Sequence, residues 1–83
     1  MKVHGFEVTP EIERACLEAM VGRFRAFDVV SAAIKVGAPI KVPTGRWMGY
    51  VAERVADRLI QRERKAGRIR RVGNRWERVE DKQ

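Results

Sequence analysis

The sequence predicts an α+β domain that is mainly α, built from a three-helix bundle, a C-terminal β-hairpin and a short third strand. Apolar residues recur at helical spacing in three segments, and the last third of the chain alternates like two strands around Gly73-Asn74. A chain of 83 residues has room for a single domain, 1–83. We expect its core to span residues 9–80, with flexible ends at 1–8 and 80–83.

The first helix is predicted to begin at Pro10 and to end at Gly22. Thr9 is a suitable N-cap, and Pro10 suits the first helical position because its missing N–H needs no partner there. Five apolar residues share one face of this helix: Ile12, Ala15, Cys16, Ala19 and Met20. Cys16 is the only cysteine, so an internal disulfide is excluded and a buried thiol is expected.

The second and third helices are separated by a connection that contains two prolines. Residues 23–25 are expected to be a short strand before a second helix over 26–36, in which Phe27, Val30 and Ile34 share one face. Residues 38–45 have no helical period, and Thr44 or Gly45 can cap a third helix over 46–66. The predicted core stripe of that helix is Met48, Val51, Ala52, Val55, Leu59 and Ala66.

Two registers are open to the C-terminal hairpin. A two-residue turn pairs Ile69 with Arg78, whereas a three-residue loop pairs Ile69 with Val79 and Val72 with Trp76. We expect the second register because it keeps apolar residues together on one face. Trp76 can then anchor the hairpin to the helices, and stacking of its ring on a base is the alternative.

Positive charge is concentrated in the second half of the chain. The net charge is +7, and residues 46–83 hold twelve of the 18 Lys and Arg residues but only six of the 11 acidic ones. Arginine, with 13 residues, outnumbers lysine, with five. Guanidinium groups suit phosphates and the edge of guanine, so this half of the chain indicates a polyanionic partner. A merely solvated charged surface is the alternative.

Two segments resemble the winged helix-turn-helix family of DNA-binding domains: FRAFDVVSAAIKVG and VAERVADRLIQRERKAGRIRRVGNRWERV. The most specific part is a long amphipathic helix that ends in Lys65-Ala66-Gly67 and is followed by a strand with a glycine tip at Gly73. The resemblance implies that a recognition helix over 46–66 enters the major groove. It also implies that a wing over 68–79 lies on the DNA backbone or in the minor groove. The 38–45 connection is longer than the tight turn of that family, and it can make contacts of its own.

Eleven residues are candidates for DNA contact. On the recognition helix they are Arg46, Trp47, Tyr50, Glu53, Arg54 and Arg58; on the wing they are Arg68, Arg70, Arg71, Asn74 and Arg75. Arginine can fork onto guanine, glutamate can accept from cytosine, and Arg58 and Lys65 can reach phosphates. Against this reading, Glu53 and Asp57 repel phosphates, and Trp47 and Tyr50 can instead cover the edge of the core.

The function expected from these observations is double-stranded DNA binding, as a small cytoplasmic transcription regulator or a replication or recombination accessory of bacterial or phage type. The alternative is a protein-interaction winged helix whose basic face docks on an acidic or nucleic-acid-binding protein. We expect no enzyme activity, metal or cofactor, because one histidine and one cysteine form no metal motif and the catalytic motifs are missing. RNA is a further option, a homodimer through Leu17, Ile40 and Val42 is a hypothesis, and neither a signal peptide nor a membrane span is expected.

Overall fold

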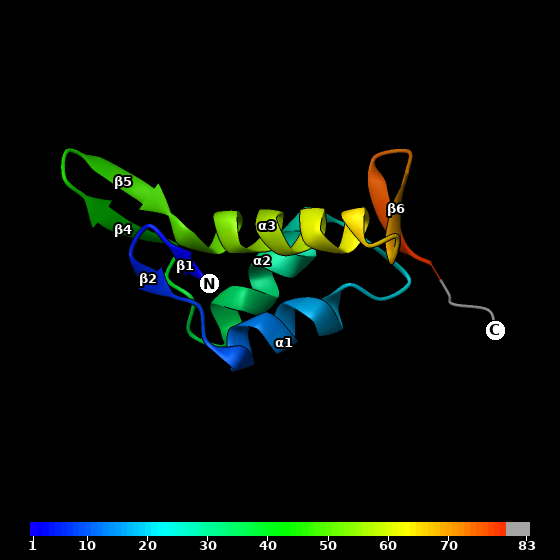
Figure 1. Ribbon diagram of the computed structural model, residues 1–83, viewed down its shortest axis with the longest axis horizontal. Helices are drawn as coiled ribbons and strands as arrows, with labels where there is room; N and C mark the ends of the chain where they lie inside the picture. Colours follow the sequence, from blue (N-terminus) through cyan, green and yellow to red (C-terminus); the bar gives the residue numbers. More distant parts are fainter. Residues whose placement is uncertain (80–83) are drawn as a thin grey trace.

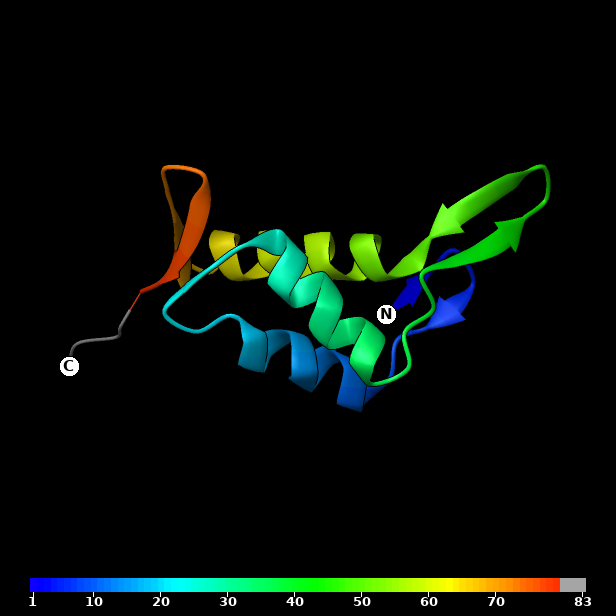
Figure 2. The same ribbon diagram turned by 180° about the vertical axis from the view of Figure 1, so that it is seen from behind.

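Three helices form the body of the fold in the computed structural model, which describes residues 1–79. They are α1 (Pro10–Ala19), α2 (Ala26–Lys35) and α3 (Val51–Lys65). α3 runs along the long axis of the molecule above α1, and α2 crosses on the side that faces the viewer in Figure 2 (Figures 1 and 2). Seven short strands pair antiparallel in three small sheets within the described part. The predicted α+β class with three helices is therefore confirmed.

α1 begins as predicted. The side chain of Thr9 accepts a hydrogen bond from the backbone N–H of Ile12 at 3.2 Å, and Pro10 occupies the first turn. Its inner face buries Ile12 and Cys16, and Met20 at the C-cap is also buried. The helix ends at Ala19, before the predicted Gly22, whose φ of 56° belongs to the turn into the next strand. This first helix therefore supplies one wall of the core.

α2 turns a different face to the core from the one that the sequence predicted. It follows the predicted short strand, β3 (Arg23–Phe24), and its first turn is closed by the Asp28 carboxylate, which accepts from the Arg25 backbone N–H at 2.8 Å. Val29 and Ala33 are buried, whereas Phe27 is 73% exposed and Ile34 is 38% exposed. Because Val30 is only partly buried as well, one apolar face of α2 remains open.

Residues 41–50 form a hairpin, so the predictions of an irregular connection and of a helix from residue 46 are wrong. β4 (Lys41–Thr44) pairs with β5 (Trp47–Tyr50), and Gly45 takes the positive φ of 70° that the tight turn requires. α3 therefore begins at Val51, with Tyr50 as its N-cap.

The first turn of α3 needs no side-chain cap, because the carbonyls of Ile40 and Pro39 accept from the N–H groups of Val51 and Ala52 at 3.0 and 3.1 Å. The predicted core residues Val51, Ala52, Val55 and Leu59 are buried. Met48 and Ala66, which were placed in the same stripe, are exposed because they lie outside the helix.

The N-terminal segment 1–8, expected to be flexible, forms a hairpin between β1 (Lys2–Val3) and β2 (Phe6–Glu7). His4 and Gly5 have φ of 49° and 81°, as a tight hairpin turn requires. Val3 is 1% exposed and belongs to the main core. The His4 ring lies against Gly49 of β5 so closely that a Cβ there would be 2.5 Å from its Cγ. The first residues thus support the β4–β5 hairpin.

The C-terminal hairpin has the shorter of the two possible turns, so the expected three-residue loop is wrong. β6 (Ile69–Val72) pairs with β7 (Arg75–Arg78), with Ile69 opposite Arg78 and Gly73 at a φ of 62°. β7 lies between β3 and β6 in a three-stranded sheet. A residue placed opposite buried Ile69 was expected to be apolar, but Arg78 serves because its guanidinium group finds polar partners there.

The predicted tail 80–83 lies outside the described residues. Within residues 1–79, none of the helices combines the length and the apolar character that crossing a membrane would demand.

Candidate nucleic-acid interface

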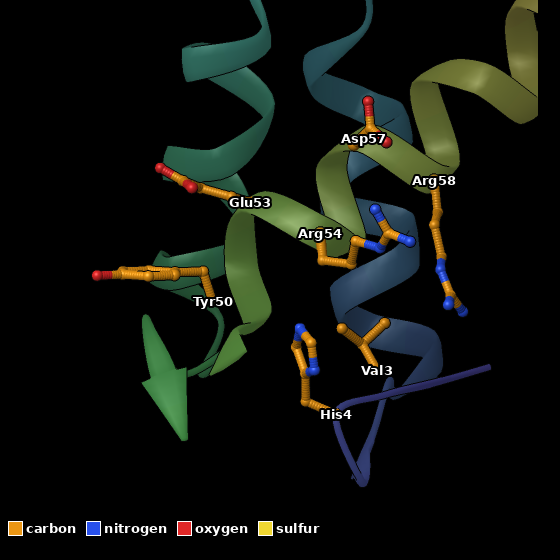
Figure 3. A pocket seen from close by; sticks show the side chains of 7 residues that line it. All are labelled: Val3, His4, Tyr50, Glu53, Arg54, Asp57 and Arg58. Atoms are coloured by element: carbon orange, nitrogen blue, oxygen red, sulfur yellow. The ribbon is translucent and has the colours of Figure 1, made fainter. Parts of the chain in front are cut away.

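The outward face of α3 carries two charged stripes of opposite sign. Arg54 and Arg58 stand one turn apart on the flank near the β1–β2 turn, and Glu53 and Asp57 stand one turn apart beside them. In Figure 3, Glu53 points away from Arg54 and Arg58; the Arg54 guanidinium group is turned toward the side of Arg58, and Arg58 extends toward the N-terminal strand. Like charges at i and i+4 repel each other slightly, so each stripe gains from an external counter-charge.

A shallow hollow of about 410 Å³ lies between the basic stripe and the N-terminal hairpin. Arg58 donates to the backbone carbonyl of Lys2 at 3.1 Å, which holds this arginine at the edge of the hollow. Tyr50 lies at the other end, half exposed at 52% (Figure 3). Of the predicted recognition-helix residues, the structure therefore brings Tyr50, Glu53, Arg54 and Arg58 together around one hollow.

Arg46 and Trp47, predicted on the recognition helix, lie instead in the β4–β5 hairpin. Arg46 occupies the turn, and Trp47 follows it with 77% of its surface exposed. Trp47 therefore does not cover the core edge, which was its alternative role. Together with Lys41 and Met48, these side chains give the hairpin an exposed basic and apolar surface.

The predicted wing residues fall into two groups. Arg68 donates to Glu63 at 2.8 Å, and Arg70 makes two bonds to Glu77 at 2.8 and 3.1 Å. Arg71 instead donates to the carbonyl of Gly73 and lies 5.4 Å from the centre of the Trp76 ring. Two of the predicted DNA-contacting arginines thus have carboxylate partners within the domain itself.

At the tip of the wing, Arg75 and Asn74 are exposed, and Arg75 makes no ion pair with a carboxylate of residues 1–79. The ring of Trp76 is partly buried against the core, in keeping with its predicted anchoring role. The tip therefore presents the unpaired cation Arg75 on strand β7, which Trp76 fixes against the core.

The acidic partner on the wing is held ionised by its neighbours. Hydrogen bonds from Arg70 and then from Arg23 lower the pKa of Glu77 below its ordinary value of 4.5. Arg23 lies on β3 and Arg70 on β6, so the carboxylate joins the two strands that flank β7. Glu77 therefore has a structural explanation that needs no ligand.

Glu63 is the centre of an ion cluster that the sequence did not reveal. It is 4% exposed and accepts from Arg68 at 2.8 Å and from Arg78 at 3.2 Å. Arg78 also donates to the carbonyl of Met20 at 2.8 Å, which ties β7 to the end of α1. Its burial could have been inferred from its position in the sequence, because Glu63 lies one turn after Leu59, on the apolar stripe of α3.

The β4–β5 and β6–β7 hairpins rise to the same side of α3, one at each end of the helix (Figures 1 and 2). We call α3 together with these two hairpins the saddle. Eight exposed cations on these three elements make no ion pair within residues 1–79: Lys41, Arg46, Arg54, Arg58, Arg64, Lys65, Arg71 and Arg75. We call this set the saddle cations. Among the described residues, no three His, Cys, Asp or Glu side chains group as metal ligands.

No family model, curated protein or solved structure matches this chain.

Exposed, unpaired cations spread over α3 and the two hairpins can contact several negatively charged groups at once, provided that these are spaced along a rigid polymer.

Proposed function

We propose that this chain is a winged-helix domain that binds double-stranded DNA with the saddle. The single observation that carries the proposal is the set of saddle cations, which have no carboxylate partner within residues 1–79. By contrast, Arg68, Arg70 and Arg78 of the C-terminal hairpin segment 68–79 each pair with a carboxylate. The other unpaired side-chain cations of residues 1–79, Lys2, Arg14, Arg25 and Lys35, are spread over other elements, whereas these eight lie on α3 and its two flanking hairpins. A nucleic acid would supply the missing counter-charge and release its condensed cations.

The order of elements supports the winged-helix assignment. α1, β3, α2, α3, β6 and β7 occur in this order, with β4 and β5 inserted between α2 and α3, and β3, β7 and β6 form one antiparallel sheet. In such domains the third helix contacts the major groove, which is about 12 Å wide and admits a helix. We place Arg54 at base edges and Arg58 at a phosphate, because base contacts come from the N-terminal half of a recognition helix.

The β4–β5 hairpin adds a second projecting arm to this interface. α3 has 15 residues and is therefore about 22 Å long, which sets the separation of the roots of the two hairpins. Arg46 at one tip and Arg75 at the other can then reach phosphates on either side of the groove that α3 occupies. Trp47 would contact sugar or base edges next to Arg46. The biological role that we propose is a small regulator or an accessory of replication or recombination.

The test is a salt titration of binding to a random-sequence DNA duplex, followed by fluorescence anisotropy. Each phosphate contact contributes about −0.9 to the slope of log affinity against log salt, so Arg71→Ala with Arg75→Ala should reduce the slope by about 2. The control is Arg14→Ala with Lys35→Ala, which removes the same charge from exposed positions on α1 and α2. This control should leave the slope unchanged.

A salt-independent affinity, or equal losses in the wing pair and the control pair, would contradict the proposal. Polyglutamate added as a competitor tests the alternative that the basic face docks on an acidic protein. If it displaces the duplex at equal charge concentration, that alternative is preferred. Duplex RNA in the same titration separates DNA from RNA.

A further inference from the structure

A groove of about 620 Å³ runs between α2 and α3 and ends at the C-terminal hairpin. Its apolar lining includes Phe27, Val30, Ile34, Ile40, Ala56 and Ile60. Phe27 is 73% exposed, Ile40 is 58% exposed and Ile34 is 38% exposed, although all three side chains are large. In so small a domain, a contiguous apolar surface of this kind indicates a binding site.

The open face of α2 is a continuous stripe of apolar side chains. Phe27, Val30 and Ile34 follow the i, i+3, i+7 rule, while Val29 and Ala33 of the same helix fill the core. α2 therefore has two apolar faces, of which α1 and α3 cover only one. The second face needs an occupant if its side chains are to leave water.

The α3 rim of the groove is acidic. Glu53 and Asp57 both line it, and neither pairs with a cation within residues 1–79. The other carboxylates of residues 1–79 that make no ion pair, Glu11, Glu18 and Asp28, do not line this groove. At the far end, Arg71 over the Trp76 ring is the only cation in the lining of the described part.

We propose that this groove binds a basic amphipathic helix of a partner protein. Apolar side chains of that helix, spaced i, i+3 or i+4 and i+7, would pack on Phe27, Ile34 and Ile60, as in other helix-in-groove complexes. Lysine or arginine on one flank would pair with Glu53 and Asp57. The rim from Ala52 to Gln61 spans about 14 Å, which fits two to three turns of the partner. The proposal does not rest on DNA binding: the groove and the saddle cations share Arg71, but none of the contacts proposed for the partner helix uses it.

The probe is a synthetic helix of about 14 residues with leucine at the anchor positions and lysine elsewhere, compared with its glutamate counterpart. Anisotropy or calorimetry gives the two affinities. Net charge alone favours the glutamate peptide, because the chain is at +7. The groove predicts the opposite order, with the lysine peptide bound more tightly.

Two variants locate the binding. Glu53→Gln with Asp57→Asn should weaken the lysine peptide roughly three- to tenfold, as expected for two exposed ion pairs, and should strengthen the glutamate peptide slightly, because it removes the repulsion from the rim. Phe27→Ser should weaken both peptides by at least about tenfold, because it removes a central anchor. Phe27 is exposed, so this variant should retain the fold, and its circular dichroism spectrum checks that.

Three outcomes would overturn the proposal: tighter binding of the glutamate peptide, no effect of neutralising the rim, or no effect of Phe27→Ser. Light scattering of the free protein adds a fourth. If it forms a dimer that Phe27→Ser dissociates, a second copy of the chain occupies the groove instead of a basic helix.

Discussion

At the scale of single residues, some arginines of this chain pair with carboxylates of the domain and others remain free to bind a ligand. Glu63 is the buried carboxylate around which the paired group is built. The buried carboxylate accepts from Arg68 and Arg78 and lies 3.9 Å from Arg62. A buried ion pair is strongly coupled to its surroundings, because removal of one partner leaves the other without compensation. The cluster explains why a basic hairpin can stay attached to a basic helix.

Glu63→Gln should therefore lower the free energy of unfolding by about 2–3 kcal/mol, below the usual range for a buried pair because Arg68 is well exposed. Urea unfolding measures this. The exposed substitution Glu53→Gln is the control and should change stability by less than about 0.5 kcal/mol. An equal effect of the two substitutions would mean that the cluster is not structural.

Cys16 makes stability depend on alkaline pH. Burial, with a smaller contribution from Glu13, raises the pKa of its thiol from 9.0 to about 11. The unfolded chain ionises first, so the contribution of Cys16 is complete below pH 9.0 and is lost as the pH rises through about 11. Thermal unfolding between these values should show a decline that is shallower in Cys16→Ala. Parallel curves for the two proteins would rule out this origin.

At the scale of elements, the N-terminal hairpin determines where the β4–β5 hairpin lies. The His4 ring rests on the backbone of Gly49, where any side chain would collide with it. Neither hairpin was predicted from the sequence, since residues 1–8 were expected to be flexible and residues 46–50 to be helical. A glycine within an apparent helix pattern was the available signal, because glycine often marks a close backbone approach in a strand.

Gly49→Ala should destabilise the domain by about 1–3 kcal/mol, because the collision is with atoms near the His4 backbone. The matched control is the double variant His4→Gly with Gly49→Ala. Glycine tolerates the φ of 49° at position 4 and removes the ring, so stability should recover. Chemical denaturation of the three proteins checks this, and a double variant no better than Gly49→Ala would contradict the contact.

At the scale of the whole molecule, the sequence was sufficient where one pattern dominated. The α1 stripe, the β3 strand and the burial of Val51, Val55 and Leu59 were predicted correctly, because each rests on periodicity and capping. The start of α3 was predicted incorrectly. Backbone carbonyls of Ile40 and Pro39 cap its first turn, and such a cap leaves no recognisable residue type in the sequence.

The candidate site was predicted in residue types but not in arrangement. Arg54, Arg58, Arg71 and Arg75 remain available, whereas Arg68 and Arg70 are neutralised by Glu63 and Glu77 from elsewhere in the chain. Pairing of this kind depends on register, and in the observed register the partly buried Arg78 lies opposite Ile69 and donates to Glu63. Local sequence propensity reveals neither the ion pairs nor the strand register. Counting charges therefore overestimated the number of unpaired cations on the wing.

The middle position of β7 in its sheet bears on how the domain is synthesised. β7 is the last described strand, yet β3 pairs with it and not with β6, and Arg23 and Glu77 are 54 residues apart. A nascent chain on the ribosome therefore exposes β3 with no pairing partner until residues 75–78 have emerged. Such late, long-range closure slows folding and makes it cooperative, so that premature termination before Arg78 would yield an incomplete chain open to proteolysis.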